Sequence, residues 1–164
     1  ELAGENNPAV DLLAPVLGPG RFVGVDRDAG CVDRNAARGL PHATWVHGQL
    51  QTLLVNRPAL FARTGVLNYD SFAGWNGDSI LVETAPLVRF ARQQLDRVGE
   101  FVLIVNAAMV RNVPRHVAEA RARRVFAPLL APFGRDLEPA DLFYYRADGD
   151  RNDMLNVRVQ VGFQ

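Results

Sequence analysis

Polar or glycine residues follow most of the apolar, strand-like runs of this chain. In an open sheet of parallel strands, ligands bind at the carboxyl ends of the strands. Residues that come directly after such runs are therefore candidates for chemistry. The candidate ends are Glu1–Asn7, Asp26 with Arg27, Gly48 with Gln49 and Leu50, Asn68 with Tyr69, Asp70 and Ser71, and Asn106. Their recurrence predicts a binding site along one edge of a sheet.

Gly4 and Asp26 have the types and the spacing of a nucleotide site. A glycine lets the backbone approach a ligand closely, and the helix expected to begin at Pro8 would point its positive end to the same place. An acidic side chain about 20 residues after such a turn can accept hydrogen bonds from ribose hydroxyls, and Asp26 meets this requirement. The alternative is that Gly4 forms an ordinary turn and Asp26 caps the next helix.

The elements that must position these residues alternate between helix and strand periods. Strands are expected at 22–25, 44–46, 65–70 and 101–107, because short apolar runs there end at polar residues. Helices are expected at 8–17, 31–38 and 115–130, with a short one at 58–63. A long helix capped by Asp78 or Ser79 should bury Ile80, Leu87, Ala91, Leu95 and Val98. The unbroken apolar run at 101–107 suggests burial on both faces.

The chain ends differently, with two strand-like runs at 142–147 and 155–163 and no helix between them. Runs joined by a polar turn should pair antiparallel. The fold class expected is therefore α/β, a doubly wound, mostly parallel sheet that ends in an antiparallel β-hairpin. The simplest domain organisation for 164 residues is one domain spanning 1–164.

The composition excludes several classes of protein. Hydrophobic residues make up 48% of the chain and charged residues 22%, the profile of a globular protein. No apolar run approaches the roughly 20 residues of a membrane span. Cys31 is the only cysteine, which excludes an internal disulfide and a thiolate zinc cluster, and fits a reducing, cytoplasmic compartment. The net charge is zero, so no overall field attracts nucleic acid.

The order of these motifs resembles that of the Rossmann-like S-adenosylmethionine-dependent methyltransferases. The stretch "ELAGENN" looks like the family's glycine-rich first motif, "FVGVDRD" like the second, and "WVHGQLQTLL" like the third. The antiparallel ending also matches. The resemblance implies that a first strand lies upstream of residue 1 and that the cofactor is S-adenosylmethionine. It implies these cofactor-binding residues: Glu1, Gly4, Glu5, Asn6, Asp26, Arg27, Gly48, Gln49 and Leu50.

The stretch "GVLNYDSF" stands where the family places its catalytic-side motif. Methyl transfer needs the acceptor to be aligned and, for some substrates, deprotonated. Asn68 and Asp70 are the candidates for that task, with Tyr69 as an aromatic wall; the alternative is that they cap the following turn. The sequence lacks the Asn/Asp-Pro-Pro-aromatic motif, and its first motif has a single glycine. His42, His47 and His116 are expected to be structural.

All 18 basic residues, histidines aside, are arginines, and five of them fall within 111–124. A solvated helix face is the ordinary explanation for such a run. The functional one is a phosphate-contacting surface beside the substrate, with Arg111 and Arg115 nearest the strand end. Nucleic acid is therefore one candidate acceptor and a small molecule is another.

Three functions follow from these patterns. The first is an S-adenosylmethionine-dependent methyltransferase. The second is a catalytically degenerate module of the same fold that serves in binding or assembly. The third, an NAD-dependent or nucleotide-sugar Rossmann enzyme, is disfavoured because the sequence has no GxGxxG signature and no lysine. The oligomeric state is not predicted, and no metal site or membrane partner is expected.

Overall fold

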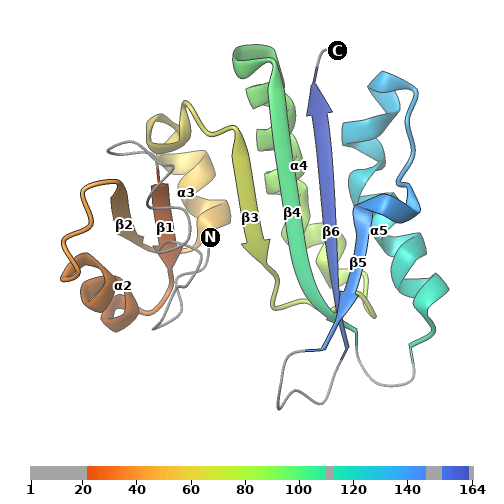
Figure 1. Cartoon of the computed structure of the whole chain (residues 1–164), viewed down its shortest axis with the longest axis horizontal. Helices are drawn as coiled ribbons and strands as arrows, with labels where there is room; N and C mark the ends of the chain where they lie inside the picture. The colour runs from red at the N-terminus through yellow and green to blue at the C-terminus, as the bar shows by residue number, and fades with distance from the viewer. Residues whose placement is uncertain (1–21, 110–112, 147–152, 163–164) are drawn as a thin grey trace. The chain divides into compact units, whose positions relative to one another are not determined.

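The computed structural model describes residues 22–109, 113–146 and 153–162. The chain forms two compact units that divide between Ala62 and Arg63 (Figure 1). Each unit has its own sheet among the described residues. Both combine helices with strands, so the expected α/β class is confirmed.

The first unit contains a pair of parallel strands. Strand β1 (Phe22–Asp26) and strand β2 (Ala43–His47) pair in register, so that Asp26 lies opposite His47. The helical elements are α2 (Ala29–Ala36), α3 (Leu50–Asn56) and the 3-10 helix η1 (Pro58–Phe61). Helix α2 begins two residues before the expected start because Asp28 is its N-cap and accepts a hydrogen bond from the Cys31 N–H.

The second unit contains a mixed sheet in the strand order β3-β4-β6-β5. Its strands are β3 (Val66–Asp70), β4 (Glu100–Met109), β5 (Leu142–Tyr145) and β6 (Asp153–Gly162). Its helices are α4 (Ser79–Val98) and α5 (Arg115–Leu130), and its 3-10 helices are η2 (Ala131–Phe133) and η3 (Pro139–Asp141).

The antiparallel ending expected from the sequence is confirmed, since β5 pairs antiparallel with β6. The expectation of a mostly parallel sheet is wrong for this unit. Only β3 and β4 are parallel, and β6 enters between β4 and β5 and runs antiparallel to both. Because β6, the last strand along the chain, inserts between β4 and β5, two of the three pairings in this sheet are antiparallel.

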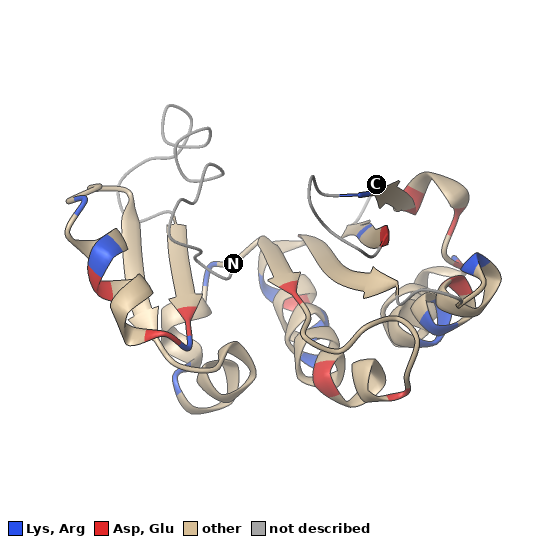
Figure 2. Ribbon diagram, turned by 90° about the horizontal axis from the view of Figure 1, so that it is seen from below, with Lys and Arg blue, Asp and Glu red and all other residues tan. Residues whose placement is uncertain are grey.

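The two faces of this second sheet differ. Helices α4 and α5 lie on the same side of it in both views (Figures 1 and 2). We call that side the helix face; it carries Leu103 of β4, which is fully buried. The opposite side, the open face, carries Val102 and Ile104, which are only half-buried. The expectation that the run at 101–107 is buried on both faces is therefore wrong for Val102 and Ile104. The reason is that the described helices cover only one face.

Helices α4 and α5 bury the residues that their apolar periods predict, with one exception. Helix α5 has the expected bounds, and the residues of its apolar period are buried: Ala118, Ala122, Val125, Phe126 and Leu129. On α4 the prediction fails at Val98, which is 40% exposed. Val98 is the last residue of the helix, and Gly99 follows it in the left-handed conformation (φ 76°), so the chain turns away there.

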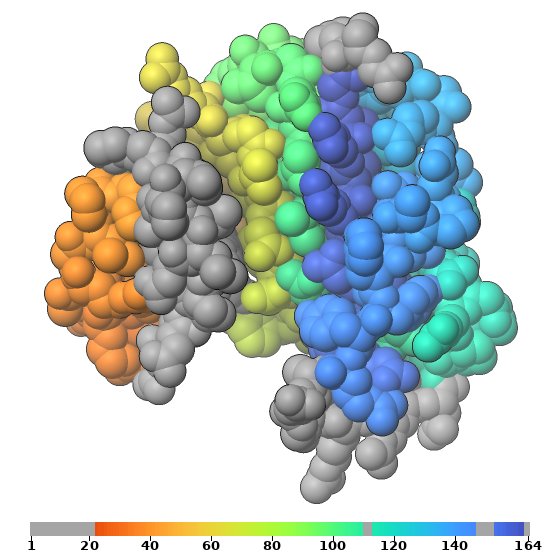
Figure 3. All heavy atoms as spheres, viewed as in Figure 1, coloured from red at the N-terminus to blue at the C-terminus, as the bar shows by residue number. Residues whose placement is uncertain are grey.

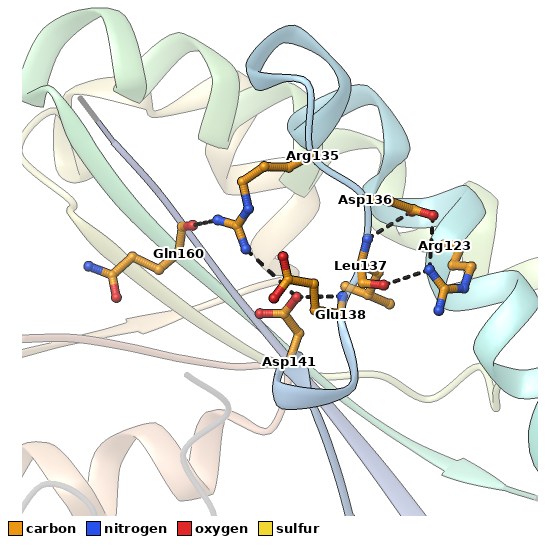
Figure 4. A network of polar contacts seen from close by, with 7 residues as sticks. All are labelled: Arg123, Arg135, Asp136, Leu137, Glu138, Asp141 and Gln160. Atoms are coloured by element: carbon orange, nitrogen blue, oxygen red, sulfur yellow. Dashed lines mark hydrogen bonds and ion pairs between the residues drawn. The ribbon is translucent and has the colours of Figure 1, made fainter. Parts of the chain in front are cut away.

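A network of polar contacts fixes the connection between α5 and β5 (Figure 4). Arg123 donates to Asp136 at 2.9 Å and to the Leu137 carbonyl. In the same connection, Arg135 donates to the Gln160 carbonyl on β6 at 2.9 Å. Both arginines bind backbone carbonyls as well as carboxylates. The connection is therefore held against α5 at Asp136 and Leu137 and against β6 at Arg135.

Candidate functional site

The carboxyl ends of β1 and β2 bring Asp26 and the turn at Gly48 together. The Gly48 N–H donates to the Asp26 carbonyl at 2.8 Å. Gly48 has a φ of 147°, and a Cβ there would lie 3.2 Å from the Leu53 side chain, so this turn requires glycine. The Asp26 side chain uses Oδ1 to accept the Asp28 N–H at 2.8 Å. Its other oxygen, Oδ2, accepts no hydrogen bond from the residues that the structure describes. It can therefore accept one from a ligand hydroxyl.

The neighbours of Asp26 have separate roles. The His47 Nε2 lies 3.0 Å from the Arg27 carbonyl. Because a carbonyl only accepts, this nitrogen must carry the proton and donate, so His47 ties the two strand ends together, which fits a structural histidine. Gln49 is exposed, whereas Leu50 is buried in its own unit. Of these two residues, which the resemblance assigns to cofactor binding, only Gln49 presents its side chain to solvent.

Asn68 and Asp70 lie on the open face of the second sheet and share one partner. Asn106 of β4 donates from its Nδ2 to Asp70 Oδ1 at 2.7 Å and to Asn68 Oδ1 at 3.0 Å. Asn106 is 8% exposed, and it also accepts a hydrogen bond from the Nδ2 of Asn156 on β6. The result is a cluster of three amides and one carboxylate at the carboxyl end of the parallel pair β3–β4, with Asp70 exposed at its edge. A carboxylate in that position can accept an N–H or O–H of a bound acceptor.

Tyr69 does not belong to this cluster. Successive side chains of a strand point to opposite faces, and Tyr69 is 3% exposed on the helix face. The expectation of an aromatic wall beside Asn68 and Asp70 is therefore wrong for Tyr69. The exposed aromatic side chain in the same row as Asp70 is Phe143 of β5.

Tyr69 instead meets a carboxylate on α4 that orders the loop after β3. Glu83 accepts hydrogen bonds from the Tyr69 hydroxyl, from the Phe72 N–H at 3.1 Å and from the Ala73 N–H at 3.0 Å. We call this arrangement the Glu83 latch. It fixes the loop directly after Asp70, because one charged group takes three donors of the strand end and loop.

The rest of this loop is held against β4 and β6. The Ser71 N–H donates to the Asn106 carbonyl at 2.7 Å, and the Trp75 N–H donates to the Ala108 carbonyl at 2.9 Å. Trp75 is fully buried, and its indole N–H donates to the Leu155 carbonyl at 2.9 Å. A Cβ on Gly74 would lie 2.9 Å from the Ala108 carbonyl, so glycine permits this close approach.

The arginines of α5 are engaged within the chain. Arg121 donates to the Trp75 carbonyl at 3.1 Å and, with Arg124, pairs with Asp78 at 3.5 and 3.4 Å. Arg123 belongs to the network of Figure 4. Arg115 lies with its guanidinium carbon 4.5 Å from the centre of the Tyr144 ring. The structure therefore does not support a phosphate-contacting surface formed by Arg115 and the arginines after it.

The surroundings of Tyr144 on β5 make its hydroxyl less acidic. Burial raises its pKa to about 12, and the hydrogen bond that its hydroxyl donates to Glu119 and the charge of Glu119 act in the same direction. The charge of Arg115 opposes them. Tyr144 is thus a neutral donor that joins β5 to α5.

Some expected site residues lie outside the described part of the chain. These are Glu1, Gly4, Glu5, Asn6 and Arg111. Their proposed contacts stay predictions.

Three residues of the second unit were not predicted as site residues: Asn106, Asn156 and Glu83. Asn106 was noted only as a strand end. Asn156 lies in a run whose polar side chains alternate with buried Leu155 and Val157, but its opposition to Asn106 depends on a register between distant strands. Glu83 carried no local signal, because its partners come from β3 and the loop that follows.

None of the described helices is long and apolar enough to cross a membrane. No cluster of three or more histidine, cysteine, aspartate or glutamate side chains that could hold a metal ion occurs among the described residues.

Comparison with known proteins gives a likeness to solved structures. No protein-family model matches the chain, and no curated protein matches it by sequence. The fold is similar to that of a solved structure, the release-factor-specific protein-(glutamine-N5) methyltransferase of Alicyclobacillus acidocaldarius, with a TM-score of 0.45 and 14% identity over 92% of this chain and 86% of that chain.

Proposed function

We propose that this chain is an S-adenosylmethionine-dependent methyltransferase. The observation that carries the proposal lies at the end of strand β1, where Asp26 is beside the glycine turn at Gly48. One oxygen of its carboxylate accepts no hydrogen bond from the described residues and can accept one from a ligand. An acceptor-only group next to a backbone turn suits the two hydroxyls of a ribose. S-adenosylmethionine, when bound, supplies the methyl group.

The residues of each unit have their own task in this proposal. In the first unit Asp26 accepts hydrogen bonds from the ribose, and Gln49 faces the adenine. In the second unit Asp70 accepts a proton or a hydrogen bond from the nucleophilic group of the methyl acceptor, and Asn68 orients that group. Transfer from a sulfonium requires mainly alignment, so these few polar groups suffice.

Cofactor binding tests the first task. Isothermal titration calorimetry of the purified protein with S-adenosylhomocysteine should show binding, and Asp26→Ala should weaken it about 10- to 100-fold, the effect of losing a charge-assisted hydrogen bond of ~1.5–3 kcal/mol. Asp33→Ala, which removes a carboxylate from the exposed side of helix α2, is the matched control and should leave binding unchanged. An absence of binding by the unaltered protein would refute the proposal.

Transfer of a labelled methyl group tests the second task. With a panel of small-molecule, peptide and protein acceptors, Asp70→Asn should lower kcat by about 100-fold or more, the contribution typical of general acid–base catalysis. The dissociation constant of S-adenosylhomocysteine should stay the same, because that ligand is assigned to the first unit.

A second candidate is a binding or assembly module that has kept the cofactor site without transferase activity. It is favoured by the engagement of the four described α5 arginines within the chain, which leaves them poorly placed to hold an anionic acceptor. Cofactor binding without transfer to any acceptor in the panel would favour this candidate over the enzyme.

A further inference from the structure

One row of residues crosses the whole second sheet on its open face. In register, Asp70 of β3 lies opposite Asn106 of β4, Asn106 opposite Asn156 of β6, and Asn156 opposite Phe143 of β5. The first three are joined by side-chain hydrogen bonds. Asp70 and Asn156 are two strand spacings apart, roughly 10 Å, and Asn106 lies between them.

The order of donors and acceptors in this row follows from Asp70 alone. A carboxylate only accepts, so Asn106 must turn its Nδ2 toward Asp70. The Oδ1 of Asn106 then faces β6, where it requires a donor, and Asn156 supplies its Nδ2. Each amide has one orientation that satisfies its neighbour, and a reversed amide would place oxygen against oxygen in a mostly buried position.

We propose that Asn156 is a positioning residue for Asp70. It contacts Asn106 and holds the amide of Asn106 in the orientation that binds both Asp70 and Asn68. The side chains of Asp70, Asn106 and Asn156 form what we call the amide relay. The inference rests on the proposed function for its catalytic meaning, since Asp70 is the group to be positioned, but the relay itself can be tested by stability alone.

A double-mutant cycle between positions 70 and 156 tests the relay. Asn156→Asp places an acceptor-only group against the Oδ1 of Asn106, and in the unaltered background Asn106 cannot donate to both sides. We expect the melting temperature to fall by about 6 °C, the effect of losing ~2 kcal/mol in a chain of this length. When Asp70→Asn is also present, all amides can reverse together, and the same substitution should cost about 2 °C or less.

Salt separates the relay from direct repulsion between two carboxylates. Repulsion across roughly 10 Å is screened in 1 M NaCl, where the Debye length is about 3 Å, whereas a reversed amide is unaffected. The cycle should therefore keep its difference of about 4 °C in 1 M NaCl. Equal losses in both backgrounds, or a difference that vanishes in high salt, would overturn the relay.

The double-mutant cycle tests the relay even when Asn156→Asp alone prevents folding. In that case a folded double variant, shown by circular dichroism, supports the relay, and an unfolded double variant counts against it. This experiment uses the whole chain and needs no substrate, so it gives its answer whether or not the protein transfers methyl groups.

The positioning role has its own kinetic readout. Asn156→Ala should lower kcat by about 10-fold and leave the dissociation constant of S-adenosylhomocysteine unchanged, because the loss acts through Asp70. Arg158→Ala changes the next open-face residue of β6, which is exposed and lies opposite Ile104, and should leave kcat unchanged. Equal kcat values for Asn156→Ala and the unaltered enzyme would overturn the role, whereas no transfer by the unaltered enzyme would refute the proposed function and leave the relay standing.

Discussion

The two faces of the second sheet use polar residues in opposite ways. On the helix face, Tyr69 is buried and its hydroxyl donates to Glu83. Glu83 also accepts hydrogen bonds from two N–H groups of the next loop. On the open face, Asn68 and Asp70 are joined through Asn106, yet Asp70 remains exposed to solvent. On the open face, the exposed carboxylate of Asp70 can still accept a hydrogen bond from a ligand. On the helix face, the described contacts of Tyr69 and Glu83 stabilise the fold.

This difference arises within three consecutive residues of one strand. Because side chains alternate along β3, residues 68 and 70 face one environment and residue 69 faces the other. The strand therefore both anchors the unit and displays the candidate chemistry. Matched substitutions on the two faces test whether this difference holds in solution.

The largest difference should come from two neighbours on β4. Leu103→Ala removes a fully buried side chain from the helix face and should cost about 3–5 kcal/mol of unfolding free energy. Ile104→Ala, on the half-buried open face, should cost about 1 kcal/mol. Urea denaturation monitored by circular dichroism measures both, and equal losses would mean that the two faces are equally covered in solution.

The Glu83 latch should come next. Glu83→Gln keeps the size of the side chain but replaces an oxygen that accepts loop donors with an amide nitrogen, so we expect a loss of about 1–3 kcal/mol. Amide hydrogen exchange at Phe72 and Ala73 should also become faster. Val82→Ala, at an exposed position one residue earlier on α4, is the control and should change neither measurement.

A smaller, pH-dependent effect should come from Tyr144 on the helix face. The pKa of this hydroxyl is about 12 in the folded protein and about 10 when unperturbed. Folding therefore favours the neutral form, and the stabilisation is complete below pH 10 and is lost as the pH rises from 10 toward 12. Melting temperatures between pH 8 and 11.5 should fall less steeply for Tyr144→Phe than for the unaltered protein; parallel curves would contradict the assignment.

The smallest effect should come from the open face of β5. Phe143 is 49% exposed, and Phe143→Ser should change the unfolding free energy by less than about 1 kcal/mol. A loss as large as that of Leu103→Ala would show that something covers this face. Denaturation of the two variants side by side gives the answer.

Much of the fold was predictable from local patterns. The bounds of α5 and the antiparallel pair at the chain end followed from apolar periodicity and from the polar turn. The position of β6 between β4 and β5 was not predictable, because strand order depends on packing between distant segments and leaves no mark in a short window of sequence.

The candidate site was only half predictable for the same reason. Asn68, Asp70 and Asp26 were found because polar residues at strand ends are a local signal. The error at Tyr69 came from reading three adjacent residues as one group, although a strand sends them to two faces. Asn156 and Glu83 reach the site through register and helix packing, so their roles required the three-dimensional structure.

The pinned loop between β3 and α4 has a consequence for how a ligand would be bound. Glu83, Asn106, Ala108 and Leu155 hold it through contacts to its backbone and to Trp75. A segment restrained in this way has little conformational entropy left to lose, so an acceptor that meets Asp70 finds its surroundings preorganised. Binding there should leave the loop where it is, and discrimination between acceptors should depend on fit rather than on closure of a mobile lid.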